Sequence, residues 1–239
     1  MDHVATRPHQ NRRRWIVMVA ATGLALVLVV AVALSRSSDV VPSAAGPSAS
    51  SGPGDATTTV RWEVVGGVSL PVSPAHGPRV ETGGLASGYS RSESGAALAA
   101  AQVLMRTSAT SGSDVFLPVI ATQVTGTNVA AFKAATLEDY ERLRAQAAVA
   151  SGAPIPGADA RIVGYRIARY GETSGTAVVE VVVSSPTLSA RAPFVSFAVA
   201  LQWSYGDWRV VAPARGDWGS VSTALGSRPA GLLTYDQIR

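Results

Sequence analysis

Hydrophobic positions divide the chain into successive segments. Residues 15–34 form an apolar run without a charged side chain, and a helix that rises ~1.5 Å per residue crosses the ~30 Å hydrocarbon core of a bilayer in about 20 residues. Residues 35–59 are rich in Ser, Pro, Gly and Ala, which predicts a disordered, flexible linker. Periodic patterns over residues 60–218 predict one folded domain, and residues 219–239 are predicted as a C-terminal tail.

A helical period predicts three helices in the first half of the folded domain. The first begins at Ser92 or Ser94, whose hydroxyl groups are suited to cap a helix, and it ends near Arg106. The second covers residues 114–124, where Pro118 is tolerated only in the first turn.

The third helix, over about residues 129–149, has the clearest amphipathic pattern. Glu138 precedes Arg142 by four residues, the order that favours an ion pair along a helix. Its buried face is predicted from side chains that recur at spacings of three and four, namely Phe132, Thr136, Tyr140, Leu143 and Ala147.

A period of two dominates the last third of the chain. The turn at Tyr205-Gly206-Asp207 joins the last two strands and places Trp203 opposite Trp208. Helices followed by antiparallel strands predict an α+β domain with the helices on one face of a four-stranded sheet. The strands are predicted over residues 163–167, 177–183, 195–203 and 208–211.

A short extended segment is predicted ahead of the helices, over residues 60–65. The Gly66-Gly67 pair follows it, and then a proline-rich stretch that ends at Pro78. Because proline cannot donate a hydrogen bond to a neighbouring strand, we expect this arm to lie against the domain rather than inside its sheet.

The formal net charge of +4 is concentrated before the apolar run. The first 14 residues carry four arginines against one aspartate, and the remaining residues carry 16 basic against 15 acidic side chains. Arg12, Arg13 and Arg14 predict a cytoplasmic N-terminus, because basic residues resist transfer across the bilayer. The domain is then extracytoplasmic in a single-pass protein of the cell membrane. Its balanced charge predicts no direct binding to nucleic acid.

The same N-terminus has a second interpretation as a cleaved secretory signal. Ala31-Val32-Ala33 fits the small-x-small cleavage pattern behind a positively charged segment. Signal peptides have apolar segments of about 7–15 residues, shorter than the run over 15–34, which favours a retained signal-anchor. Cleavage after Ala33, which would release a secreted protein, is the alternative to the anchor.

Residues with catalytic or metal-binding chemistry are scarce. The chain has no cysteine and three histidines. Of these, only His76 lies beyond the N-terminal tail, in a stretch that we do not count as part of the folded core. No phosphate-binding loop, nucleophile elbow, zincin motif or calcium loop is present in the sequence. We predict no catalytic residue, no metal and no cofactor.

Short phrases rich in Gly, Pro and Trp lie between residues 62 and 218, namely Trp62-Glu63-Val64, Leu70-Pro71-Val72-Ser73, Gly77-Pro78, Gly88-Tyr89-Ser90, Gly95-Ala96-Ala97-Leu98, Gly206-Asp207-Trp208-Arg209 and Gly216-Asp217-Trp218. They resemble a family of actinobacterial single-pass membrane proteins of unknown function that is often associated with conjugative elements. The order of three helices and an antiparallel sheet resembles the cone-shaped nuclear-transport-factor-like fold.

The order of basic tail, membrane helix, linker and folded domain resembles the inner-membrane scaffold proteins of type IV secretion and conjugation channels. This resemblance implies a non-enzymatic assembly component of a conjugative DNA-transfer apparatus. Its implied partners are the lipid bilayer, further copies of the chain and other membrane-channel subunits. Because this similarity concerns only the order of segments along the chain, it suggests a function but identifies no functional residue.

The resemblance to cone-shaped domains also implies an alternative, a tethered small-ligand-binding or lyase-like domain. Some such domains are isomerases, dehydratases or cyclases with a pocket, and Tyr140, Tyr165 and Glu180 are conceivable pocket groups here. Tyr140 has the spacing of a core residue, and Glu180 lies opposite the apolar face of its strand. These positions favour a domain without catalysis.

Two side chains are candidates for contact with a partner protein. Trp218 lies in a segment after the last predicted strand, and tryptophan often anchors protein interfaces. Arg166 lies on the opposite face of its strand from Arg161 and Arg169, which we interpret as solvated strand ends.

Overall fold

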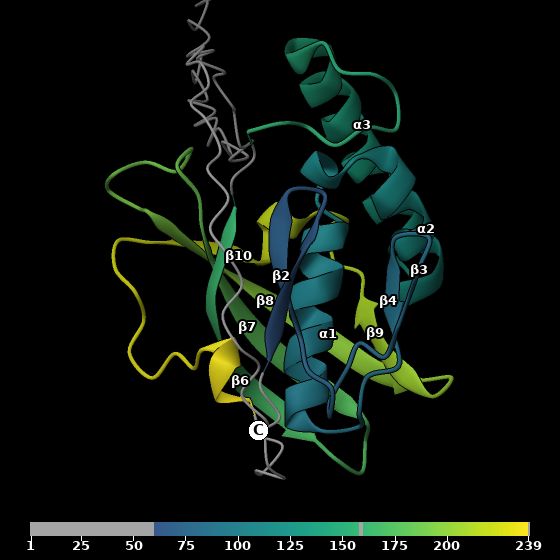
Figure 1. Cartoon of the computed structure of the whole chain (residues 1–239), viewed down its shortest axis with the longest axis vertical. Coiled ribbons are helices and arrows are strands. Elements are labelled where there is room, and N and C mark those ends of the chain that lie inside the picture. Colours follow the sequence, from purple (N-terminus) through teal and green to yellow (C-terminus); the bar gives the residue numbers. More distant parts are fainter. Residues whose placement is uncertain (1–59, 158–159, 239) are drawn as a thin grey trace, which may run out of the picture.

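Helix α1 (Glu93–Arg106) lies against a six-stranded sheet in the computed structural model, which describes residues 60–157 and 160–238 (Figure 1). The helix begins where predicted, because the Ser92 hydroxyl accepts a hydrogen bond from the backbone N–H of Gly95. Every residue from Gly95 to Arg106 is buried. The alanines among them are small enough to let the helix approach the sheet closely.

The large sheet has the strand order β5-β9-β8-β7-β6, and β10 pairs with the first part of β8. β9 pairs with the last part of β8, so β9 and β10 follow one another along the same side of that strand. All pairs are antiparallel except β5 with β9. The strands are β5 (Val124–Thr125), β6 (Arg161–Gly171), β7 (Thr176–Ser184), β8 (Phe194–Ser204), β9 (Asp207–Val211) and β10 (Ser222–Leu225).

Two hairpins that precede α1 form small sheets of their own. β1 (Arg61–Val65) and β2 (Val68–Val72) are joined by a Gly-Gly turn, and β3 (Val80–Thr82) pairs with β4 (Leu85–Ser87). Neither hairpin pairs with the large sheet. The first hairpin thus behaves as the expected arm, with its proline kept out of the central ladder.

Helices α2 (Ser113–Gln123) and α3 (Val129–Ala147) confirm the other two predicted helices. Pro118 lies inside α2, beyond the first turn where we expected it to be tolerated. Arg142 pairs with Asp139 at 2.6 Å rather than with the predicted partner four residues earlier. Buried residues of α3 confirm most of its predicted face, and they are Phe132, Thr136, Tyr140 and Leu143. Short 3₁₀ helices are η1 (Ala109–Ser111), η2 (Trp218–Val221) and η3 (Tyr235–Gln237).

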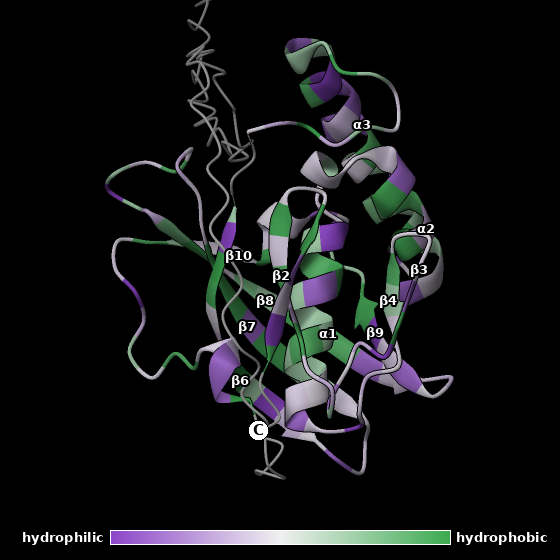
Figure 2. Cartoon of the chain, in the orientation of Figure 1, coloured by the Kyte–Doolittle hydropathy of each residue, from purple (hydrophilic) through white to green (hydrophobic). Residues whose placement is uncertain are grey.

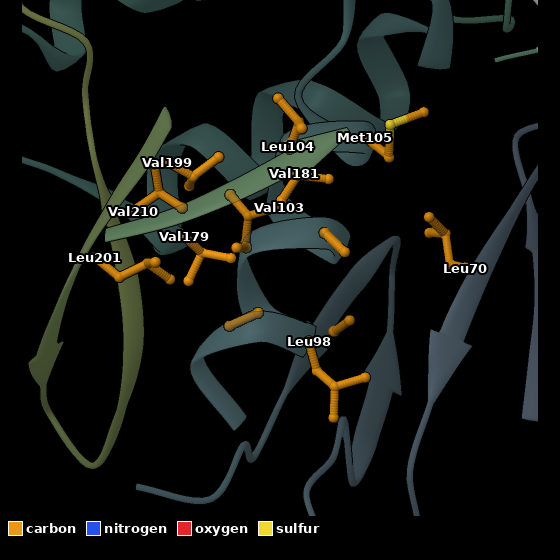
Figure 3. Packing of buried hydrophobic residues seen from close by; sticks show 14 of the residues in the cluster. Leu70, Leu98, Val103, Leu104, Met105, Val179, Val181, Val199, Leu201 and Val210 are labelled. Carbon is orange, nitrogen blue, oxygen red and sulfur yellow. The ribbon is translucent and has the colours of Figure 1, made fainter. Parts of the chain in front are cut away.

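The core lies between α1 and the sheet. Figure 3 shows Val103 of α1 beside Val179 and Val181 of β7 and Val210 of β9, and all four are fully buried. Figure 2 shows the central strands mainly in the colours of hydrophobic residues, whereas α3 carries many hydrophilic ones. The sheet face under α1 is therefore filled by aliphatic side chains, whose burial stabilises the fold.

The predicted fold class is wrong. We expected a cone-shaped nuclear-transport-factor-like domain with a four-stranded antiparallel sheet, and the structure has a mixed six-stranded sheet with two separate hairpins ahead of the helices. The missed strands β5 and β10 have two and four residues, too few to show a period of two. The predicted membrane helix over residues 15–34 lies outside the described residues. Among those that are described, no helix is both long and apolar enough to cross a bilayer.

Candidate partner-binding groove

A groove of about 420 Å³ opens between the β1–β2 hairpin and the start of β6. This volume lies in the range of about 300–1,000 Å³ that is typical of ligand sites. Because the hairpin does not pair with the large sheet, its wall of the groove and the β6 wall come from separate sheets. The groove is lined by Trp62, Gly67, Ser69, Ala160, Arg161 and Ile162.

Trp62 of β1 is the large aromatic side chain of this groove. Its indole Nε1 donates a hydrogen bond of 2.9 Å to a carboxylate oxygen of Asp236. Its ring meets Tyr235 edge-on, with 6.2 Å between ring centroids. These contacts hold the indole in place, and 40% of the Trp62 surface stays exposed. A fixed and half-exposed tryptophan is the kind of side chain that anchors protein interfaces.

Apolar and cationic side chains adjoin the indole. Val64 follows Trp62 by two residues on β1, so both side chains lie on one face of the hairpin, and Val64 is 73% exposed. On the opposite wall Arg161 is exposed, and none of the ion pairs among residues 60–157 and 160–238 includes it. Trp62 and Val64 thus form an apolar strip on β1 beside the groove, and Arg161 supplies one positive charge in its lining.

The C-terminal segment packs beside this region, against Trp62 and β6. Leu233 exchanges two backbone hydrogen bonds with Tyr165 of β6, at 2.8 and 2.9 Å. The Tyr235 ring packs on Tyr165 with 4.6 Å between centroids, and Tyr235 and Ile238 are both buried. The segment predicted as a tail therefore contributes buried side chains and helps to position Trp62.

The comparisons with known proteins locate the chain in a family. A family model described as a domain of unknown function (DUF8175) matches residues 30–228. The chain belongs to this family. The comparisons with curated proteins and with solved structures find no match. In this DUF8175 member the match includes Trp62 and Arg161 and ends before Leu233 and Asp236.

A histidine–serine cluster lies at the start of α1 in this family member. The Nδ1 atom of His76 is 2.9 Å from the Ser90 hydroxyl, and this hydroxyl is 2.7 Å from that of Ser92, which caps α1. His76 is therefore part of the described fold, contrary to our expectation. The shared hydrogen bonds tie the proline-rich arm to the first turn of the helix.

A buried arginine joins α1 to the β3–β4 hairpin. The Arg106 side chain donates to Gln102 at 3.0 Å, to the Gly84 carbonyl at 2.8 Å and to Glu81 at 3.2 Å. Burial lowers the pKa of the Arg106 guanidinium, and the Glu81 carboxylate opposes this shift. Each guanidinium nitrogen has a hydrogen-bond partner, so Arg106 has a structural role and cross-links α1 to the β3–β4 hairpin.

The sequence-derived candidates lie apart from one another. Arg166 pairs with Glu180 across β6 and β7 at 2.5 Å. Trp218 packs edge-on against Phe132 and Phe197, and its Nε1 donates to the hydroxyl of Thr107 at 3.1 Å. The topology residues Arg12, Arg13 and Arg14 lie outside the described residues.

The conceivable pocket groups do not converge either. Tyr165 packs on Tyr235, whereas Tyr140 packs on Phe116 and its hydroxyl donates to backbone carbonyls after α3. Sequence reasoning passed over Trp62 as a site residue. The available signal was its alternation with Val64 in a segment that was expected to lie outside the sheet.

Proposed function

We propose that this DUF8175 member is a non-enzymatic, single-pass membrane protein whose extracytoplasmic domain binds a partner protein in the Trp62 groove. The observation that carries the proposal is the half-exposed indole of Trp62, fixed by Asp236 and Tyr235 beside the exposed Val64 and Arg161. Tryptophan and arginine dominate the binding energy of many protein interfaces.

The sequence supports the membrane and assembly parts of the proposal. The apolar run over residues 15–34 follows three arginines, the arrangement of an anchor with a cytoplasmic N-terminus. The same order of tail, anchor, linker and domain in conjugation-channel scaffold proteins makes a conjugative DNA-transfer apparatus the proposed setting. The partner is then another channel subunit or a second copy of this chain.

The packing of the domain favours a role in protein assembly over a catalytic role. Aliphatic side chains of α1 and of β7, β8 and β9 fill the sheet face, and the groove at the hairpin is lined by one aromatic, one aliphatic and one cationic side chain among small residues. Such a lining offers contact area and one charge, which suits a protein surface.

Site-specific photocrosslinking in intact cells tests this function. A photoreactive residue replaces Ser69, which is exposed on the groove wall, and the matched control replaces Thr173, which is exposed in the β6–β7 turn. We expect an adduct of defined mass at Ser69 and none at Thr173. Equal adducts at both positions, or none at Ser69, would overturn the proposed partner site. The mass separates a second copy of the chain from another subunit.

A further inference from the structure

We propose that the partner enters the Trp62 groove as an extended segment that adds a strand to the free edge of β6, with an acidic side chain opposite Arg161. This inference rests on the proposed function and deepens it by naming the form and charge of the bound segment.

The position of β6 supplies the edge. It is the last strand in the order β5-β9-β8-β7-β6, so one of its two sides has no neighbouring strand of the sheet. On that side the described residues place one backbone contact, the pair between Tyr165 and Leu233. An edge strand of this kind is a template for another extended segment.

The contact with Leu233 shows that a backbone segment can pair with this edge of β6 as a neighbouring strand would. Tyr165 and Leu233 both donate and accept, which is the hydrogen-bonding of an antiparallel pair. Gly164 permits the close approach, because a Cβ atom at this position would lie 2.4 Å from the Leu233 carbonyl oxygen. The groove begins on the same strand at Ile162 and Arg161, a few residues before Tyr165.

The side chains on the two walls of the groove indicate which residue types the bound segment carries. Arg161 is exposed without an ion pair among the described residues, so an acidic side chain on the partner would gain a charge-assisted hydrogen bond. Across the groove the Trp62 indole offers an apolar face for a neighbouring side chain of the same segment. An apolar and an acidic residue in an extended segment meet both walls.

A peptide-display selection tests this binding mode and requires no identified partner. The probe is a randomised octapeptide library, selected on the detergent-solubilised full chain, on its Arg161→Glu variant and on an Arg169→Glu control. Arg169 is exposed on the same strand. We expect the full chain and the control to select an acidic residue beside an apolar one, and Arg161→Glu to select a basic residue instead. Loss of the acidic preference in the control, or its persistence in Arg161→Glu, would overturn the inference.

Backbone methylation separates strand addition from side-chain docking. Peptides selected on the full chain are resynthesised with N-methyl groups at alternate residues, in both registers. We expect one register to weaken binding at least tenfold and the other to change it less than twofold. Equal effects in both registers would reject strand addition. The proposed function would still stand if the Ser69 crosslink forms, and it would fall if that crosslink is absent.

Discussion

The indole Nε1 of Trp62 donates a 2.9 Å hydrogen bond to Asp236, which joins the first described strand to the last 3₁₀ helix across 174 residues of sequence. The same ring meets Tyr235 edge-on. One wall of the candidate groove is therefore held in place by the C-terminal segment. Changes in that segment should alter binding in the groove, although the segment lies beyond the lining residues.

Removal of the Trp62 ring should affect binding more than stability. We expect Trp62→Ala to lower the free energy of unfolding by about 1–2 kcal/mol, because part of the ring is already exposed to water, and to abolish the Ser69 crosslink. Val80→Ala is the control, since Val80 is 53% exposed on the separate β3–β4 hairpin. Denaturant unfolding and crosslink yield check the prediction, and a retained crosslink in Trp62→Ala would contradict it.

A side chain at position 164 should displace the C-terminal segment from β6. The Cβ atom of Gly164→Ala would lie 2.4 Å from the Leu233 carbonyl oxygen and 2.9 Å from the Leu232 side chain. We expect a loss of about 1–3 kcal/mol in unfolding free energy from this overpacking. Hydrogen exchange should accelerate at the Leu233 amide, and unchanged protection there would contradict the prediction.

The Trp218 side chain should matter for stability, since it packs against Phe132 and Phe197 and donates to Thr107. We expect Trp218→Ala to cost about 2–4 kcal/mol in unfolding free energy, because the ring is half-buried rather than fully enclosed. Tyr205→Ala is the aromatic control and should change stability by no more than about 1 kcal/mol, since Tyr205 is 93% exposed and its ring contacts only the Arg209 guanidinium among the aromatic and cationic contacts of the described residues. Equal costs in denaturant unfolding would contradict this assignment.

The pKa shifts of Glu81 and Glu63 should change the unfolding free energy with pH in opposite directions. Partial desolvation raises the pKa of Glu81 above its ordinary value of 4.5, the Arg106 charge opposes this shift, and the neighbouring Glu63 carboxylate adds to it. The stability linked to Glu81 is therefore full below its unfolded pKa and is lost as the pH rises through its raised folded pKa. A hydrogen bond from Arg61 lowers the pKa of Glu63, so its contribution is present above the unfolded pKa and is lost as the pH falls.

Glu81→Gln isolates the first of these effects. We expect the stability of this variant relative to the wild type to be higher at about pH 7 than at about pH 3.5, because the variant never carries the charge that partial desolvation and the Glu63 carboxylate disfavour. Denaturant unfolding across this range measures the difference. A relative stability that does not change with pH would contradict the prediction, and Glu172→Gln, at an exposed turn position, is the control.

The proposed anchor predicts the fate of the full chain in cells. A C-terminally tagged chain should sediment with membranes at full length, because an apolar helix over residues 15–34 that is not cleaved stays in the bilayer. Immunoblots of membrane and medium fractions check this. A shortened product in the medium would instead support cleavage after Ala33.

Periodicity located the regular elements well where they are long. Tyr140 and Leu143 recur on one face of α3, and Ser92 caps α1, because both signals act over a few residues of chain. The two-residue β5 is parallel to β9 and lies far from it in sequence. No local pattern encodes such a pairing, so the mixed sheet was missed.

The amino-acid sequence by itself determined the apolar run with its flanking arginines, the three helices and the four long strands, since each depends on the spacing of neighbouring side chains. Tertiary structure decided the rest. It buried one face of Trp218 between α3 and β8, and it brought Trp62, Arg161 and Asp236 to one region of the surface. Residues that lie so far apart in sequence meet only when the whole core packs. A groove between two sheets leaves no periodic pattern of hydrophobic positions in the sequence.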